Sequence, residues 1–283
     1  MPGESLTWIY RWGRDWHPGE HGEKDNPCLN GIRITASERD AYAFVTPEGR
    51  TDFNTFEDLL QKRETKADKI FEKLCTRQPI SNSEKEIFAN YIQVMLKRTP
   101  ERDRRMQALS DKTVKSFPWN LMGLHFAMQG DFGKSRQMFE MQKYFESDGG
   151  KKFLWNLTRV ETYPELHEEL AGMKWVFYVA PAETFFVTSN FPVIYERLDA
   201  GRLMFIFPIA SNIALLAKSN GSDDLQYVDA SSDEAFAINF LFIRLASGAS
   251  SPEIYAPKAE RWVWEIFNHS LGLNENQNLN LFQ

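Results

Sequence analysis

Apolar residues recur at helical spacing over two long stretches of the chain. The clearer stretch starts after Ser81, and its apolar positions are Ile87, Phe88, Tyr91, Ile92 and Met95. Ser81 and Glu84 predict a capping box, in which each side chain accepts a backbone N–H at the start of the helix. Pro100 breaks the pattern, because proline lacks an N–H and its ring clashes with the preceding turn. We therefore expect this helix to end or kink near Arg98.

The other helical patterns lie on both sides of this one. Residues 52–74 predict an earlier long helix, on which Arg63 is the polar exception in an apolar stripe. Shorter helical patterns cover residues 121–128, 135–145 and 153–169. We expect Gly149-Gly150 to break the chain and Pro164 to divide the last of these segments.

Strand patterns occur at the N-terminus and again after residue 171. Short runs rich in β-branched and aromatic residues predict strands at residues 6–12, 32–34, 41–45, 173–181, 183–189, 203–209 and 212–218. Pro47-Glu48-Gly49 predicts a turn, and so do residues 221–224. Residues 233–246 and 259–271 predict two C-terminal helices.

These elements together predict an α+β fold. An N-terminal helical half with a small β-hairpin is followed by a mostly antiparallel sheet with C-terminal helices. The helical part covers about residues 52–170 and the sheet part about residues 171–257. We expect a single domain over residues 1–283, since a chain of this length can bury one large core.

Composition excludes several classes of protein. The net charge of −6 excludes an overall basic surface of the kind that binds nucleic acid non-specifically, although a local basic groove stays open. Cys28 and Cys75 are too few for a disulfide framework or a cysteine zinc site. No apolar run approaches the roughly 20 residues of a membrane helix. We expect a cytoplasmic protein with reduced thiols and no membrane partner.

Arginines gather where the Ser81 helix is expected to end. Arg98, Arg102 and Arg105 would share one face of a continuing helix, because they are four and three residues apart. Guanidinium groups bind phosphates and carboxylates through paired hydrogen bonds, so this face is a candidate anion site. Two other interpretations stay open: a solvated charged surface, or ion pairs with glutamates such as Glu64 of the preceding helix.

A second candidate site follows the predicted strand at residues 183–189. Ser189 and Asn190 stand before Phe191-Pro192, where Ser189 would serve as a nucleophile and Asn190 as a hydrogen-bond donor to an anion. Serine and asparagine also favour turns through local backbone hydrogen bonds, which is the alternative. His17 and His21 are separated by Pro18-Gly19 and indicate a loop, so we expect no metal site, and the sequence identifies no cofactor.

Several of these segments resemble the bacterial family called domain of unknown function 4238. The resemblance rests on Arg98-Thr99-Pro100 with Arg102 and Arg105, on the stretch from Phe186 to Pro192, and on residues 205–216, and it covers nearly the whole chain. The family opens with a His-Tyr-Val-Pro-Arg-like segment that this chain lacks. Asn190 stands where the family usually has an acidic residue, which removes one candidate metal ligand or base. The resemblance suggests a link to phage defence.

Two functional hypotheses follow. The first is a defence-associated, nuclease-like or phosphate-recognising enzyme, in which Glu64 is the base, Arg98, Arg102 and Arg105 stabilise anionic oxygens, and Ser189 and Asn190 orient the substrate. Its partner would be a phosphate-bearing ligand or nucleic acid. The alternative is a non-catalytic binding or interaction module, a degenerate member of the family, in which the arginines form ion pairs.

Overall fold

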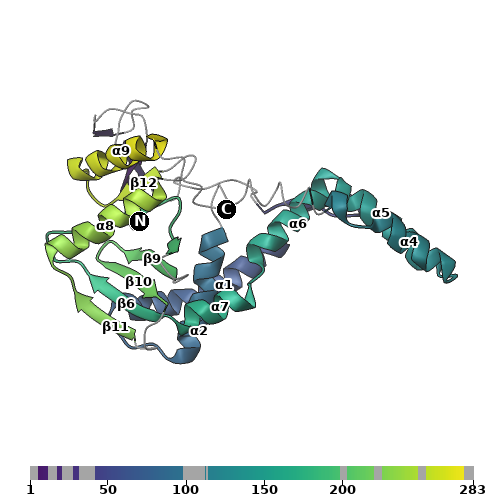
Figure 1. The fold of residues 1–283 in the computed structure, drawn as a ribbon, viewed down its shortest axis with the longest axis horizontal. Helices are drawn as coiled ribbons and strands as arrows, with labels where there is room; N and C mark the ends of the chain where they lie inside the picture. The colour runs from purple at the N-terminus through teal and green to yellow at the C-terminus, as the bar shows by residue number, and fades with distance from the viewer. Residues whose placement is uncertain are drawn as a thin grey trace, which may run out of the picture. The chain divides into compact units, whose positions relative to one another are not determined.

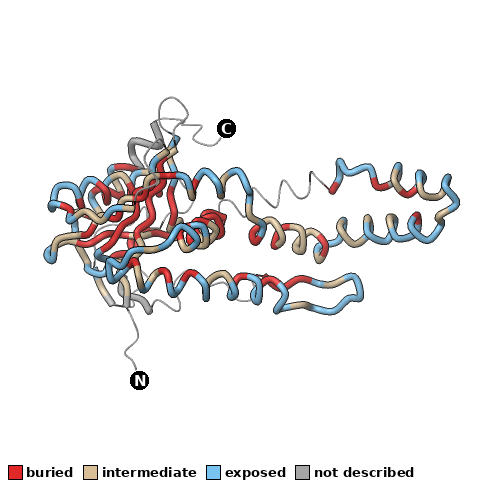
Figure 2. The backbone as a smooth tube through the Cα atoms, turned by 90° about the horizontal axis from the view of Figure 1, so that it is seen from below, coloured by how far each residue is buried: buried red, intermediate tan, exposed pale blue. Residues whose placement is uncertain are grey.

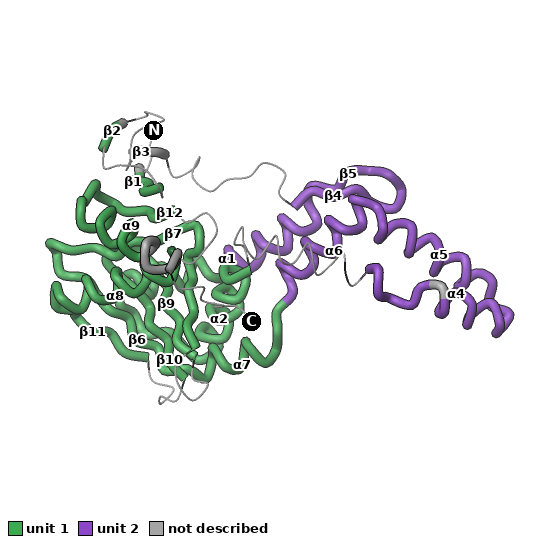
Figure 3. Tube along the Cα trace, turned by 45° about the horizontal axis from the view of Figure 1, so that its top comes forward, with its two compact units in different colours: residues 1–37, 66–99, 162–283 green, residues 38–65, 100–161 purple. Residues whose placement is uncertain are grey.

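The computed structural model describes residues 6–11, 18–20, 28–31, 42–97, 112, 114–197, 203–219, 225–247 and 253–276. The chain divides into two compact units (Figure 3). Unit 1 consists of residues 1–37, 66–99 and 162–283, and unit 2 consists of residues 38–65 and 100–161. The fold is α+β, as the sequence predicts, whereas the single domain over residues 1–283 stays a prediction.

A five-stranded sheet forms the centre of unit 1 (Figure 1). Its strands, in spatial order, are β11 (Leu225–Asp229), β6 (Lys174–Val179), β10 (Ile213–Lys218), β9 (Leu203–Ala210) and β8 (Ile194–Arg197). All neighbouring strands are antiparallel except β11 and β6, which are parallel. The prediction of a mostly antiparallel sheet is confirmed, although β8 and β11 were not predicted.

Both faces of this sheet are buried, and Figure 2 shows buried residues gathered along its strands. Phe205 and Phe207 of β9 point into one apolar cluster, while Met204 and Ile206 point into another. The alternation of side chains along a strand sends neighbours to opposite faces. A strand covered on both faces therefore reads as a continuous apolar run, which is the pattern of residues 203–209.

Helices cover both faces of the sheet. One cluster holds residues from the second part of α1 and from α2 and α7, and the other holds residues from α8 and α9. These helices are α1 (Thr55–Cys75), α2 (Asn82–Lys97), α7 (Pro164–Gly172), α8 (Ser232–Ala246) and α9 (Arg261–Asn276). Pro164 stands in the first turn of α7, where its missing N–H costs no hydrogen bond.

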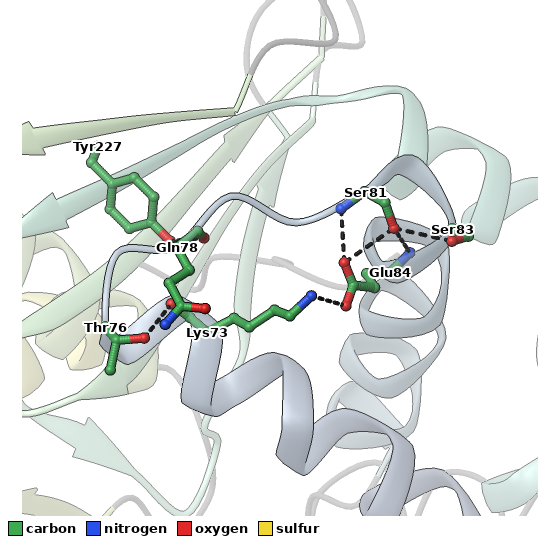
Figure 4. Close-up of polar contacts among 7 residues, drawn as sticks. All are labelled: Lys73, Thr76, Gln78, Ser81, Ser83, Glu84 and Tyr227. Atoms are coloured by element: carbon green, nitrogen blue, oxygen red, sulfur yellow. Dashed lines mark hydrogen bonds and ion pairs between the residues drawn. The ribbon is translucent and has the colours of Figure 1, made fainter.

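The predicted capping box at the start of α2 is confirmed. The Glu84 carboxylate accepts the Ser81 N–H at 2.9 Å, and the Ser81 hydroxyl accepts the Glu84 N–H at 3.3 Å (Figure 4). The Lys73 ammonium at the end of α1 binds the same carboxylate. This hydrogen bond is the main cause of a pKa of about 2 for Glu84, and the Ser81 N–H contributes further.

A second sheet in unit 1 brings the N-terminus to the C-terminal half of the chain. Its strands, in spatial order, are β2 (Gly19–Glu20), β3 (Cys28–Gly31), β1 (Leu6–Arg11), β12 (Glu253–Ala256) and β7 (Thr188–Ser189). The strand predicted over residues 183–189 is correct only at its last two residues. Residues 185–187 are held instead by Asn239 of α8, whose amide binds Phe185 O and Val187 N.

In the part of unit 2 that the structure describes, the first part of α1 is joined by a hairpin and by the helices α4, α5 and α6. These elements are β4 (Phe44–Val45), β5 (Thr51–Asp52), α4 (Trp119–Met128), α5 (Phe132–Glu146) and α6 (Asp148–Val160). Gly49 turns the hairpin with a φ of +79°, as expected for a tight turn. Phe44, Phe56 and Phe153 pack ring against ring at centroid distances of 5.2 to 5.6 Å.

The break predicted at Gly149-Gly150 is wrong, because both residues lie in the first turn of α6. Ser147 caps this helix by accepting the Gly150 N–H. A Cβ on Gly149 would lie 2.7 Å from Val45 O, and a Cβ on Gly150 would overlap the Tyr144 carbonyl. The glycines are therefore needed for close backbone packing, and the sequence pattern alone does not separate that need from a helix break.

Some predictions concern residues outside the described ranges. They include the strand at residues 32–34, the turn at residues 221–224, the loop histidines His17 and His21 and the helix end near Arg98. Among the described helices, none is long and apolar enough to cross a membrane.

Candidate functional site

Three strand ends bring five polar side chains together in unit 1. β12 pairs with β7 on one side, placing Ile254 opposite Ser189, and with β1 on the other, placing Glu253 opposite Arg11. We call the resulting group the Ser189 corner, and its members are Ser189, Asn190, Glu253, Tyr255 and Arg11. It contains both candidate residues of the predicted strand end.

Ser189 is only 4% exposed, and its hydroxyl is engaged by one neighbouring residue. The hydroxyl donates to Phe191 O at 2.8 Å and accepts the Phe191 N–H at 3.0 Å. These are local side-chain-to-backbone bonds of the kind that serine makes in turns. The Ser189 side chain therefore fixes the turn that leaves β7.

Asn190 extends the pairing of β7 with β12 beyond the strand. Its backbone N–H donates to Glu253 O at 3.3 Å, and its side-chain Oδ1 accepts the Glu253 N–H at 3.1 Å. The amide oxygen thus takes the place of a backbone carbonyl in the ladder. An aspartate would also accept this N–H, so the position suits either residue type for a structural reason.

The Glu253 carboxylate is held by two side chains. Arg11 Nε donates to Oε1 at 3.3 Å across the strands, and Tyr255 Oη donates to Oε2 at 2.9 Å. Burial raises the pKa of Tyr255 well above the ordinary tyrosine value, and the neighbouring Glu253 charge raises it further. Tyr255 therefore stays a neutral hydrogen-bond donor to Glu253.

The chemistry of this corner is that of a hydrogen-bonded anchor. A serine nucleophile needs a base within hydrogen-bond reach that can take its proton. The Ser189 proton points to a backbone carbonyl oxygen, and the described partners of the Glu253 carboxylate are Arg11 and Tyr255. The arrangement accordingly holds three strand ends together.

Other members of the predicted site have different positions. Glu64 is half-exposed on the part of α1 that belongs to unit 2, whereas Ser189 and Asn190 belong to unit 1. Arg98, Arg102 and Arg105 lie outside the described residues. In the part of the chain that the structure describes, no group of three His, Cys, Asp or Glu side chains could hold a metal ion.

Sequence reasoning missed three members of the corner and the amide that supports it. Arg11, Glu253 and Tyr255 come together only through the pairing of chain ends some 240 residues apart, as the Arg11–Glu253 separation of 242 shows. Asn239 had a usable signal, because it is an amide inside the apolar run of residues 235–243. A buried amide is retained where it satisfies backbone groups, and Asn239 satisfies two.

Comparison with known proteins identifies the family. Neither curated proteins nor solved structures give a match. The model of the family described as "Protein of unknown function (DUF4238)" matches residues 22–259, which is well over half of the chain. The matched range contains Ser189, Asn190, Glu253 and Tyr255. The protein belongs to the DUF4238 family.

Proposed function

We propose that this protein is a non-catalytic module that recognises a phosphate-bearing ligand through Arg98, Arg102 and Arg105. In this account Ser189 and Asn190 are structural. The observation that carries the proposal is the double contact of the Ser189 hydroxyl with the Phe191 backbone. A hydroxyl that donates to a carbonyl has no base to activate it, which favours binding over a reaction at Ser189.

The ligand class follows from the arginine run. Guanidinium groups present fixed forks of donors that match phosphate oxygens, and their charge persists at every physiological pH. The run begins directly after Lys97, the last residue of α2. Lys97 is 3% exposed, and its ammonium lies 3.9 Å from the centre of the Tyr163 ring. Arg98 is therefore attached to a helix end that is itself packed into unit 1.

The competing hypothesis is the nuclease-like enzyme, with Glu64 as its base. The two described hydrogen bonds of the Ser189 hydroxyl are both made with the Phe191 backbone. The cytoplasm is the proposed location, and the exposed free thiol of Cys75 is compatible with a reducing compartment.

The test combines binding with turnover. Fluorescence anisotropy with 5′-phosphorylated RNA and DNA oligonucleotides would compare the wild type with the triple variant Arg98→Ala, Arg102→Ala, Arg105→Ala. Arg136→Ala is the matched control, since its side chain is 82% exposed in a surface ion pair with Glu140. We expect the triple variant to lose binding. The slope of log K against log salt concentration should fall in magnitude by about 0.7 to 0.9 for each lost phosphate contact.

Two results would contradict the proposal. One is equal binding by the wild type and the triple variant. The other is phosphodiester cleavage by the wild type that disappears in both Glu64→Ala and Ser189→Ala, which would support the enzyme.

A further inference from the structure

Tyr163 joins the last turns of α2 to the start of α7. Its backbone makes two hydrogen bonds with the fully buried Gln93: Gln93 Nε2 donates to Tyr163 O at 3.3 Å, and Gln93 Oε1 accepts the Tyr163 N–H at 2.9 Å. Pro164, the first residue of α7, confines Tyr163 to an extended conformation with φ −93° and ψ 116°. The backbone of Tyr163 is therefore fixed by a helix on each side.

The Tyr163 ring covers a buried cation and still meets solvent. The Lys97 ammonium lies 3.9 Å from the ring centre, and Lys97 is only 3% exposed. An ammonium at this distance lies against one face of the ring. Tyr163 is nevertheless 37% exposed, so solvent reaches the part of the ring that Lys97 does not cover. The result is a flat aromatic surface that is held in place from below.

This surface lies beside the start of the arginine run. Lys97 is the last residue of α2, and Arg98 is bonded directly to it. A ligand whose phosphate is bound by Arg98 therefore comes close to the Tyr163 ring. Proteins that bind single-stranded nucleic acid combine positive charges along the sugar-phosphate backbone with aromatic rings on which the bases stack.

We infer that an unpaired base of a single-stranded nucleic acid stacks on the Tyr163 ring while the neighbouring phosphates bind the arginine run. The inference rests on the proposed function and names its ligand, a nucleic acid strand in place of a bare phosphate. Because every base has an aromatic face, stacking on Tyr163 accepts bases of any sequence.

The surroundings of the ring favour a base over a further phosphate. Glu165 is exposed in the first turn of α7, two residues after Tyr163, and its carboxylate repels a phosphate placed at the ring. An uncharged base carries no such penalty. The contacts with Gln93 and Lys97 also hold Tyr163 before the ligand arrives, so little conformational freedom is lost on binding.

Fluorescence anisotropy with two labelled, 5′-phosphorylated strands of equal length tests the inference. One strand is oligodeoxyadenylate, and the other is the abasic sugar-phosphate oligomer. The wild type should bind the oligodeoxyadenylate at least about 5-fold more tightly, which is the lower end of the contribution of one stacked base. In Tyr163→Leu the ratio of the two affinities should fall to about one. Tyr163→Phe and Tyr163→Trp should keep the ratio, because both retain a ring.

Phe236→Leu is the matched control. Phe236 is an exposed aromatic residue of α8, 47% exposed, and α8 covers the face of the central sheet opposite to α2. Its replacement should leave both affinities unchanged. The ratio also separates stacking from support of the fold, because a displaced end of α2 would weaken the binding of both strands by the same factor.

The outcomes distinguish this inference from the proposed function. A wild type that binds both strands equally, with binding that needs the arginines, would overturn the stacking role of Tyr163 and leave the proposed function intact. Equal weakening of both strands in Tyr163→Leu, or loss of the ratio in Tyr163→Phe, would also overturn stacking. If the triple variant Arg98→Ala, Arg102→Ala, Arg105→Ala binds the abasic strand as the wild type does, the proposed function fails and the inference fails with it.

Discussion

The buried amide of Asn239 offers a quantitative test of how the Ser189 corner is held. Asn239 is 2% exposed; its Nδ2 donates to Phe185 O at 2.7 Å and its Oδ1 accepts the Val187 N–H at 2.9 Å. Phe185 and Val187 are themselves buried, and Val187 leads directly into β7. The amide therefore supplies α8 with a fixed connection to the strand that carries Ser189.

Asn239→Ala should lower the free energy of unfolding by about 3 kcal/mol. The substitution leaves one buried backbone donor and one buried backbone acceptor without their partner, and each such group costs roughly 1–3 kcal/mol. Urea unfolding followed by tryptophan fluorescence measures the change, and the Trp262 ring, 5.6 Å from the Phe185 ring, is a local reporter. The exposed Asn82 provides the control, since Asn82→Ala should change stability by less than about 0.5 kcal/mol.

Hydrogen exchange locates the effect. The Val187 amide should exchange faster in Asn239→Ala than in the wild type, because its acceptor has been removed. A loss of stability below about 1 kcal/mol, or a Val187 amide that stays equally protected, would refute the role assigned to Asn239.

Three further predictions concern the helix starts and the corner. Glu84 has a folded-state pKa of about 2, which is below its unfolded value. The ionised Glu84 carboxylate therefore stabilises the folded protein above about pH 4.3, and this stabilisation is lost as the pH falls towards 2. Glu84→Gln should remove that part of the acid sensitivity in unfolding curves measured at different pH values. The Tyr255 pKa is raised on folding, so the neutral phenol stabilises the folded protein below about pH 10 and this stabilisation is lost above it. Tyr255→Phe should therefore reduce the loss of unfolding free energy at alkaline pH. An unchanged loss would contradict the burial of Tyr255 as a neutral donor. Gly150→Ala should destabilise unit 2 by more than about 1 kcal/mol in urea unfolding, because the added Cβ overlaps Tyr144. Gly133→Ala is the control and should be neutral or stabilising, because its Cβ meets only Asp131 Oδ1 at 3.6 Å. Equal effects of the two substitutions would be inconsistent with the packing at α6.

The sequence predicted those helices and strands that are determined by residues close together along the chain. The start of α2 follows from Ser81 and Glu84, and the start of α7 follows from Pro164, because caps and prolines act within one turn. The apolar and β-branched runs at residues 203–209 and 212–218 identified β9 and β10 as strands. These features give the α+β class without any tertiary information.

The features that the sequence did not predict depend on contacts between residues that are far apart along the chain. Residues 185–187 have a strand-like composition, but their backbone binds the Asn239 amide. Of the predicted strand, only Thr188–Ser189 therefore forms β7. β12 becomes a strand because β1 and β7 lie on either side of it, and neither neighbour is close in sequence. The Ser189 corner could therefore be predicted only in its Ser189-Asn190 part, and its Glu253–Arg11 pair could not.

The most direct test of the account is the effect of Ser189→Ala on phosphodiester cleavage and on oligonucleotide binding, measured with the same folded protein. We predict only background cleavage of RNA and DNA by both the wild type and Ser189→Ala, with binding that depends on Arg98, Arg102 and Arg105. Cleavage by the wild type that is abolished in a Ser189→Ala variant with normal circular dichroism and unchanged binding would show that Ser189 reacts, and the account would be wrong.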